Sequence, residues 1–192
     1  MTQITLLPQL GDRWSPRVFK AVQIGEQQMK TLIEAARWAP SSRNSQPWRF
    51  IYASKKDTEN WGKLLDCLVD SNKAWARYAS HLLLACVVKI DPATNRPRKH
   101  AWYDLGLAMA NLTFQANSMG IFVRNMGGFE VEKAVVNFSI PETIEPVVMM
   151  ALGYPDETIK KHPEFDVPLK ENRKREELGK LIYTGSWEEM NW

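Results

Sequence analysis

Residues 81–90 are the longest apolar stretch of the chain and read His-Leu-Leu-Leu-Ala-Cys-Val-Val-Lys-Ile. A continuous run of this kind, without alternation of polar and apolar residues, is typical of a strand that is buried on both faces. We therefore expect a central strand here, with other elements covering both faces of its sheet. The run is too short to span a bilayer.

The segment after this strand is expected to supply one covering helix. Residues 91–99 contain two prolines and indicate a loop, whereas residues 100–119 contain no proline and one glycine. Gly120 is suited to end that helix. Apolar residues lie on more than one side of the helix, which predicts burial against the sheet or a partner chain.

The remaining patterns complete the predicted fold. Helices are expected over residues 25–39, 57–69 and 130–138, and strands over residues 48–53, 121–126 and 146–154. Because strands and helices alternate without regular βαβ repeats, we predict an α+β fold with a mixed central sheet flanked by helices. A length of 192 residues with 44% hydrophobic content supports one domain over residues 1–192. Residues 160–192 are charged and rich in proline, and are expected to form an extended tail.

Composition excludes several classes of protein. The net charge of +3 comes from 25 basic and 22 acidic residues without a long basic block, so a nucleic-acid-binding module is poorly supported. Cys67 and Cys86 lie in apolar surroundings and outside any CxxC motif, which predicts buried thiols in a reducing compartment. Residues 1–11 lack the pattern of a signal peptide. We expect a cytoplasmic protein without a membrane segment.

Four separated segments carry the candidate chemistry. They are Arg13-Trp14-Ser15-Pro16-Arg17-Val18-Phe19; Ala39-Pro40-Ser41-Ser42-Arg43-Asn44-Ser45-Gln46-Pro47-Trp48; Met126-Gly127-Gly128-Phe129 with Ile140-Pro141-Glu142 and Ala151-Leu152-Gly153-Tyr154-Pro155; and Arg173-Lys174-Arg175 ahead of Trp187. In this order and spacing they resemble the nitroreductase family over roughly residues 12–187. The resemblance implies a homodimeric FMN-dependent oxidoreductase that reduces small electron-poor acceptors with electrons from NAD(P)H.

The first segment supplies two candidate cations. The phosphate of FMN carries about two negative charges, and such a group needs fixed cations. The resemblance assigns Arg13 to this phosphate, lines the site with Trp14 and Ser15, and places Arg17 near the N1/C2=O edge of the flavin. A cation at that edge stabilises the negative charge that reduction leaves on N1. Without the resemblance, the pattern also fits solvated arginines ahead of a helix.

The second segment is small, polar and bounded by two prolines. Its pattern alone also fits a loop that ends a helix. In the family this loop reaches FMN that is bound mainly by the other subunit. The resemblance therefore implies flavin contacts from Pro40, Ser41, Ser42 and Asn44, whereas Gln46 is expected to be structural.

Asn72 and the Gly127-Gly128 pair have two interpretations each. The amide of Asn72 offers a donor and an acceptor to the pyrimidine edge of the flavin, but Asn also caps helices. Some family members carry a lysine three residues after this Asn; Trp75 stands here instead, which leaves Arg17 as the only cation expected at N1. Gly127 and Gly128 fit a turn, or a close approach of the backbone that lets an N–H donate to flavin N5.

The tail supplies the remaining residues. The resemblance assigns Arg173 and Arg175 to the flavin phosphate, and two residues spaced in this way lie on the same side of an extended chain. Trp187 and Trp192 are large apolar groups that an isolated charged tail would leave in water. We therefore predict that the tail wraps around a second copy of the chain, with the flavin at the interface.

Several sequence motifs of known cofactor and metal sites are absent. The sequence has no GxGxxG after a strand, no HExxH, no CxxC and no P-loop, and its three histidines are isolated. We nominate no catalytic side chain and no metal ligand; NAD(P)H would be a transient donor in a ping-pong hydride transfer. Two rivals remain open: another reductive enzyme on the same fold, such as a dehalogenase or a flavin-consuming enzyme, and a non-catalytic flavin-binding protein.

Overall fold

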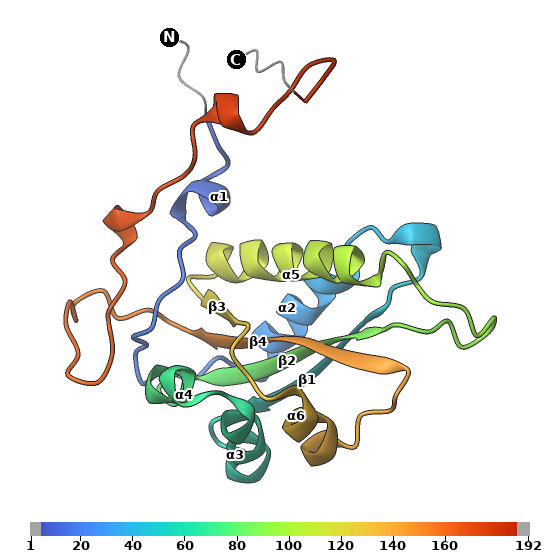
Figure 1. The fold of residues 1–192 in the computed structure, drawn as a ribbon. Coiled ribbons are helices and arrows are strands. Elements are labelled where there is room, and N and C mark those ends of the chain that lie inside the picture. Colours follow the sequence, from blue (N-terminus) through green and yellow to red (C-terminus); the bar gives the residue numbers. More distant parts are fainter. Residues whose placement is uncertain (1–4, 188–192) are drawn as a thin grey trace.

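The computed structural model describes residues 5–187, which form a four-stranded sheet with helices on both faces (Figure 1). The strand order is β1-β2-β4-β3. The strands are β1 (Trp48–Ser54), β2 (His81–Val88), β3 (Phe122–Met126) and β4 (Ile144–Gly153). The predicted α+β class is confirmed. All eight residues of β2 are buried, as its apolar run predicted.

The prediction of a mixed sheet is wrong for the described residues, because every strand pair among them is antiparallel. The strands β2 and β3 run in the same direction and are joined through α5 (Ala101–Ser118). They do not pair with each other, since β4 lies between them and runs the opposite way. A crossover that skips one position gives a sheet without a parallel pair.

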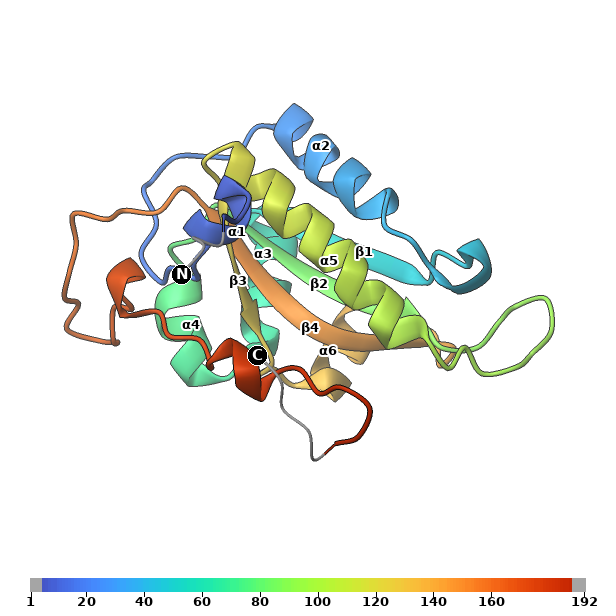
Figure 2. The same cartoon turned by 90° about the horizontal axis from the view of Figure 1, so that it is seen from above.

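Helices cover the two faces of the sheet unequally (Figures 1 and 2). One face carries α5 and α2 (Glu26–Arg37); the other carries α3 (Thr58–Cys67), α4 (Asp70–Ala76) and α6 (Val131–Phe138). Alternate residues of β2 serve two separate cores: Leu83 packs in the core with α2 and α5, and Leu84 in the core with α3 and α4. This alternation is the period of a strand that is buried on both sides.

The predicted helix ends are mostly confirmed by their hydrogen bonds. Gly120 has a φ of 71° after α5, and the Ile121 N–H donates to the Ala116 carbonyl at 2.9 Å, which is a Schellman ending. The Asp57 carboxylate caps α3 by accepting from the Asn60 N–H at 3.2 Å. However, α3 ends at Cys67 rather than at 69, because Leu68 and Val69 are extended and lead into the separate helix α4.

The N-terminal helix α1 (Pro8–Asp12) and the C-terminal tail form a projection beside the sheet (Figure 1). The tail contains only two short 3-10 helices, η2 (Lys170–Asn172) and η3 (Leu178–Lys180), within its described part. An ion pair of 3.2 Å between Lys170 and Asp12 joins the two segments. Trp187 is 81% exposed, and Trp192 lies outside the described residues. Among residues 5–187, no helix is both long and apolar enough to cross a membrane.

Candidate functional site

Three arginines from opposite ends of the chain meet beside α1. The Arg173 guanidinium donates to the carbonyls of Arg13 at 2.6 Å and of Gly11 at 2.8 Å. Burial lowers the pKa of the Arg13 guanidinium, and the nearby charges of Arg175 and Arg173 lower it further. Arg13 also donates to the Ser15 hydroxyl at 3.1 Å. We call Arg13, Arg173 and Arg175 the arginine cluster.

The arginine cluster has no carboxylate partner within residues 5–187, where none of its members forms an ion pair with Asp or Glu. The nearby carboxylate of Asp12 pairs with Lys170 instead. Like charges that are brought together raise the free energy of the folded chain unless an anion joins them. The cluster therefore has the charge and donor groups that a phosphate requires.

A second pair of cations lies against Trp75 of α4. The guanidinium carbon of Arg124 is 5.2 Å from the centroid of the Trp75 ring, and that of Arg17 is 6.0 Å away. Arg124 donates to the Ser15 carbonyl at 2.6 Å, and Arg17 to the Asp166 carbonyl at 3.1 Å. Burial, together with the charge of Arg17, lowers the pKa of Arg124 to about 10, so it stays charged at neutral pH.

Arg124 was missed by the sequence analysis, which left Arg17 as the only cation expected at this place. The available signal was an arginine inside the predicted strand 121–126, directly ahead of the glycine pair. Nothing in the sequence showed that this side chain turns toward Trp75, because that contact depends on how α4 packs against β3. The structure thus gives Arg17 a cationic neighbour.

Buried donors without partners accompany these arginines. Within the described part of the chain, Arg17 Nε and the ring N–H groups of Trp14 and Trp75 have no hydrogen-bond acceptor. A buried donor of this kind costs free energy unless a ligand or water satisfies it. Unpaired donors beside unpaired cations fit an anionic group with several acceptor atoms, and the phosphate and ring oxygens of FMN provide these.

Asn72 and Gly128 are in direct contact. The Asn72 side-chain amide donates to the Gly128 carbonyl at 3.0 Å, and Asn72 lies inside α4 rather than at its N-cap. A Cβ on Gly128 would lie 3.0 Å from both Asn72 Nδ2 and Val69 Cγ2, so packing favours glycine there. A Cβ on Gly127 would meet nothing within 4 Å. Gly127 therefore borders open space that a ligand can use.

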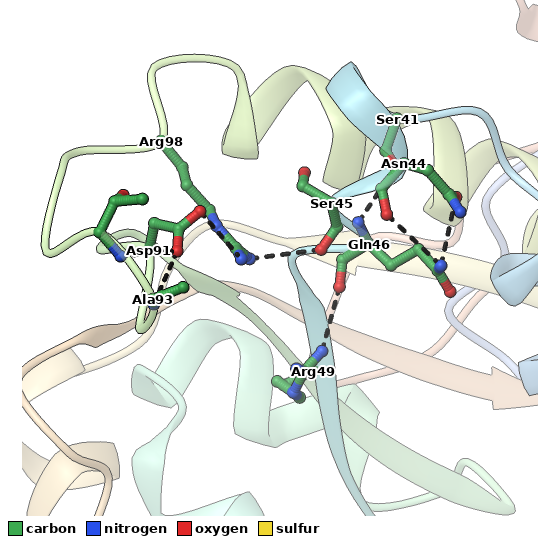
Figure 3. Close-up of polar contacts among 9 residues, drawn as sticks. Ser41, Asn44, Ser45, Gln46, Arg49, Asp91, Ala93 and Arg98 are labelled. Atoms are coloured by element: carbon green, nitrogen blue, oxygen red, sulfur yellow. Dashed lines mark hydrogen bonds and ion pairs between the residues drawn. The ribbon is translucent and has the colours of Figure 1, made fainter.

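The second predicted segment, residues 39–48, lies away from the arginine cluster and from Trp75. Its 3-10 helix η1 (Ser42–Asn44) follows α2 on the side of the molecule opposite α4 (Figures 1 and 2). Pro40, Ser42 and Asn44 are exposed, and the Ser41 hydroxyl accepts from the Gln46 N–H at 3.0 Å (Figure 3). Within one chain, the predicted site residues therefore gather in two places and not in one.

The loop has a strained backbone. Arg43 and Asn44 each have a φ of 53° and Gln46 has a φ of 43°, the left-handed region that residues with a side chain rarely adopt. A hydrogen bond of 3.1 Å from the Ser42 N–H to the buried carboxylate of Asp104 holds the loop against α5. Strain of this kind concentrates at functional sites.

Both cysteines and His81 are buried. Cys67 and Cys86 are buried free thiols, as predicted, and burial raises the pKa of Cys86 to about 12. His81 is buried beside the Ser80 hydroxyl, at 2.9 Å from its Nδ1, and burial lowers the pKa of His81 to about 4. Residues 5–187 contain no group of three or more His, Cys, Asp or Glu residues that could hold a metal ion.

Comparison with known proteins gives consistent matches. The sequence model of the nitroreductase family matches residues 10–154, which include every predicted site residue except Arg173 and Arg175. A crystal structure described as an oxidoreductase containing FMN superposes with a TM-score of 0.86 at 30% identity, covering 98% of this chain and 96% of that one.

Two named relatives come from other organisms. An Archaeoglobus fulgidus protein, provisionally named as an NADH dehydrogenase/NAD(P)H nitroreductase, is 28% identical over 154 residues, which are 78% of this chain and 84% of the relative. An iodotyrosine deiodinase of Thermotoga neapolitana is 27% identical over 162 residues, covering 73% of this chain and 83% of the relative.

Proposed function

The chain belongs to the nitroreductase family, and we propose that it is an FMN-dependent oxidoreductase that uses NAD(P)H to reduce small electron-poor acceptors such as nitroaromatics, quinones and enones. The observation that carries the proposal is the convergence of Arg13, Arg173 and Arg175 without a carboxylate. The similarity to an FMN-containing oxidoreductase supports the same cofactor. Bound flavin would supply the hydride chemistry between donor and acceptor, which use the pocket in turn.

The residues of this chain would bind and orient that cofactor. The arginine cluster would hold the phosphate, with Trp14 and Ser15 beside it. Arg17 would face the N1 edge and stabilise negative charge there, and the structure adds Arg124 at its side. Asn72 would lie at the pyrimidine edge, and the Gly127-Gly128 backbone would approach N5. None of these groups is assigned as a general acid or base, so water would supply the proton.

The proposed enzyme is a homodimer of one-domain chains, each with its tail at residues 160–192. The loop at Pro40, Ser41, Ser42 and Asn44 lies on the other side of the chain from the arginine cluster (Figures 1 and 2), and it would reach the flavin of a second copy. Exposed Trp187 and the exposed leucines of the projection are suited to an interface; these leucines are Leu6, Leu7, Leu10, Leu178 and Leu181. An obligate interface of this class buries more than roughly 2,000 Å².

A second candidate function has specific support. The similarity to an iodotyrosine deiodinase favours reductive dehalogenation on the same fold as the alternative reaction. A halogenated phenol in the acceptor panel separates the two candidates, since a nitroreductase would reduce nitroaromatics and quinones faster.

The test is the cofactor and the turnover of the purified full-length protein. Mass analysis of the released flavin should give FMN; FAD as the only flavin would refute the proposed site. NADH or NADPH oxidation should depend on an added acceptor. A protein that holds FMN but oxidises neither donor would be a flavin-binding protein and not an enzyme of this class.

The dimer is tested separately by analytical ultracentrifugation at low micromolar concentration. We expect a dimer with one FMN per chain. A full-length monomer that still holds one FMN would contradict the shared site.

A further inference from the structure

A cavity of about 470 Å³ lies at the N-terminal end of α5, on the opposite side of the molecule from the arginine cluster. The loop after α2 and the loop between β2 and α5 form its walls. Its charged lining consists of Arg43, Arg96, Arg98, Lys99, Asp91 and Asp104. The lining has four cations and two carboxylates, an excess of two positive charges.

Both carboxylates of this cavity are engaged by the protein. Asp104 is 3% exposed and accepts from the Ser42 N–H at 3.1 Å. Asp91 accepts from the Ala93 N–H at 2.8 Å and lies 3.6 Å from Arg98 Nη2 (Figure 3). These carboxylates hold the two loops, and the four cations of the lining still exceed them by two positive charges.

The cations of the cavity have fewer ion pairs and hydrogen-bond acceptors than its carboxylates have donors. The Arg98 side chain is 17% exposed; it donates to the Ser45 carbonyl at 3.3 Å, but its Nε is buried without an acceptor (Figure 3). Arg43, Arg96 and Lys99 are exposed, and within the described chain they form no ion pair. The first turn of α5, an 18-residue helix, adds the positive end of its dipole.

This arrangement fits a terminal phosphate. A phosphomonoester carries about two negative charges and accepts several hydrogen bonds, preferably from arginine. A bridging diphosphate is more often cradled by backbone N–H groups of a glycine-rich turn. The lining of this cavity contains no glycine and offers side-chain cations instead.

We propose that this cavity binds the 2′-phosphate of NADPH and makes NADPH the preferred electron donor. The inference rests on the proposed function, in which NAD(P)H is the donor and the loop after α2 lies beside the flavin of a second copy of the chain. Ser42, Arg43 and Ser45 belong to both that loop and the cavity wall, so the cavity borders the place where the donor would bind. The 2′-phosphate is the group that distinguishes NADPH from NADH.

Calorimetric titration of the purified holoenzyme tests the cavity without turnover. The probes are adenosine 2′,5′-bisphosphate, adenosine 5′-monophosphate and inorganic phosphate. We expect the bisphosphate to bind about tenfold or more tightly than the monophosphate, since it adds charge-assisted hydrogen bonds. Its affinity should fall as salt is raised.

Substitutions in the cavity wall test whether the bisphosphate binds there. Arg96→Gln and Arg43→Gln remove exposed cations and should each weaken the bisphosphate about tenfold while leaving adenosine 5′-monophosphate unchanged. Arg98→Gln should do the same, but its bond to Ser45 also supports the loop. The matched control is Arg49→Gln, because Arg49 donates to the Gln46 and Trp48 carbonyls and does not line the cavity (Figure 3).

Steady-state kinetics provide the second readout. The ratio of kcat/KM for NADPH to that for NADH should exceed about ten and should fall toward one in Arg96→Gln. Equal affinity for the two adenosine nucleotides, or variants that keep the preference, would overturn the inference. Preferential binding of inorganic phosphate alone would also overturn it. FMN content and turnover with NADH test the proposed function independently of these outcomes.

Discussion

The cations on the outer helices and those beside Trp75 differ in how they are neutralised. On α2 and α3, Lys30, Arg37 and Lys63 each pair with a glutamate three or four residues earlier, at 2.6–2.7 Å. Arg17 and Arg124 come from segments more than a hundred residues apart, lie partly buried, and pair with no carboxylate in the described chain.

The difference separates charges that serve solubility from charges that we propose to bind a ligand. Exposed pairs within one helix form locally and contribute little to stability. Cations that are gathered from distant segments lose hydration and repel one another, and they are retained only where something compensates this cost. Unpaired, partly buried arginines therefore mark the site more clearly than the number of charges does.

The largest expected effect is on cofactor affinity. Arg13→Ala and Arg175→Ala each remove one charged donor from the arginine cluster and should weaken FMN binding by about 1.5–3 kcal/mol, roughly tenfold or more in Kd. Fluorescence titration of the apoprotein measures this change. An unchanged Kd in both variants would show that the arginine cluster does not bind the phosphate.

Arg124→Met tests whether the charge beside Arg17 serves ligand binding or stability. The substitution should lower FMN affinity without lowering the thermal midpoint of the apoprotein. FMN affinity should fall about tenfold. The thermal midpoint of the apoprotein should hold or rise, since an apolar side chain replaces a partly buried charge that is close to Arg17. A lowered midpoint with unchanged FMN affinity would make Arg124 a structural residue through its bond to Ser15.

His81 is a buried ionisable group that forms no ion pair within residues 5–187. Its pKa is lowered to about 4 in the fold, so the unfolded chain binds a proton first as the pH falls below the usual 6.5. Stability is therefore present above pH 6.5 and is lost on acidification toward pH 4, by about 2 kcal/mol between about pH 7.5 and about pH 5.

Urea unfolding at the two pH values measures the His81 effect. The variant His81→Gln should lose this part of the pH dependence, since Gln does not titrate in this range. Identical pH dependence in the variant and the parent protein would show that His81 is not buried in its neutral form.

Local sequence patterns predicted the elements of this fold better than their arrangement. The apolar run of β2 and the Gly120 terminator of α5 are encoded within a few residues, and both are confirmed. The seven-residue helix α4 was not predicted, because so short a helix depends on tertiary packing. The antiparallel sheet was not predicted either, since it depends on β4 taking the position between β2 and β3.

For the candidate site, too, local sequence patterns differ from what only the packing of the chain reveals. Arg13 and Arg173 were assigned together only through the family resemblance, because no local pattern connects residues 160 positions apart. Arg124 belonged to no motif, and its position beside Arg17 became visible only from its packing against Trp75. The two places occupied by the predicted residues would form one site only in the proposed dimer.

The smallest expected effect belongs to Lys30→Ala, which tests whether the arrangement of cations matters more than their number. Lys30 pairs with Glu26 at 2.7 Å on the exposed surface of α2, where solvent screens the pair. Like Arg13→Ala, this variant removes one positive charge from a chain of net charge +3. If the overall field attracted FMN, the two variants would weaken binding equally; if contacts in the arginine cluster hold the phosphate, Lys30→Ala should leave the Kd and the thermal midpoint within experimental error. A loss of affinity in Lys30→Ala comparable to that in Arg13→Ala would show that net charge, rather than the converged arginines, sets the affinity.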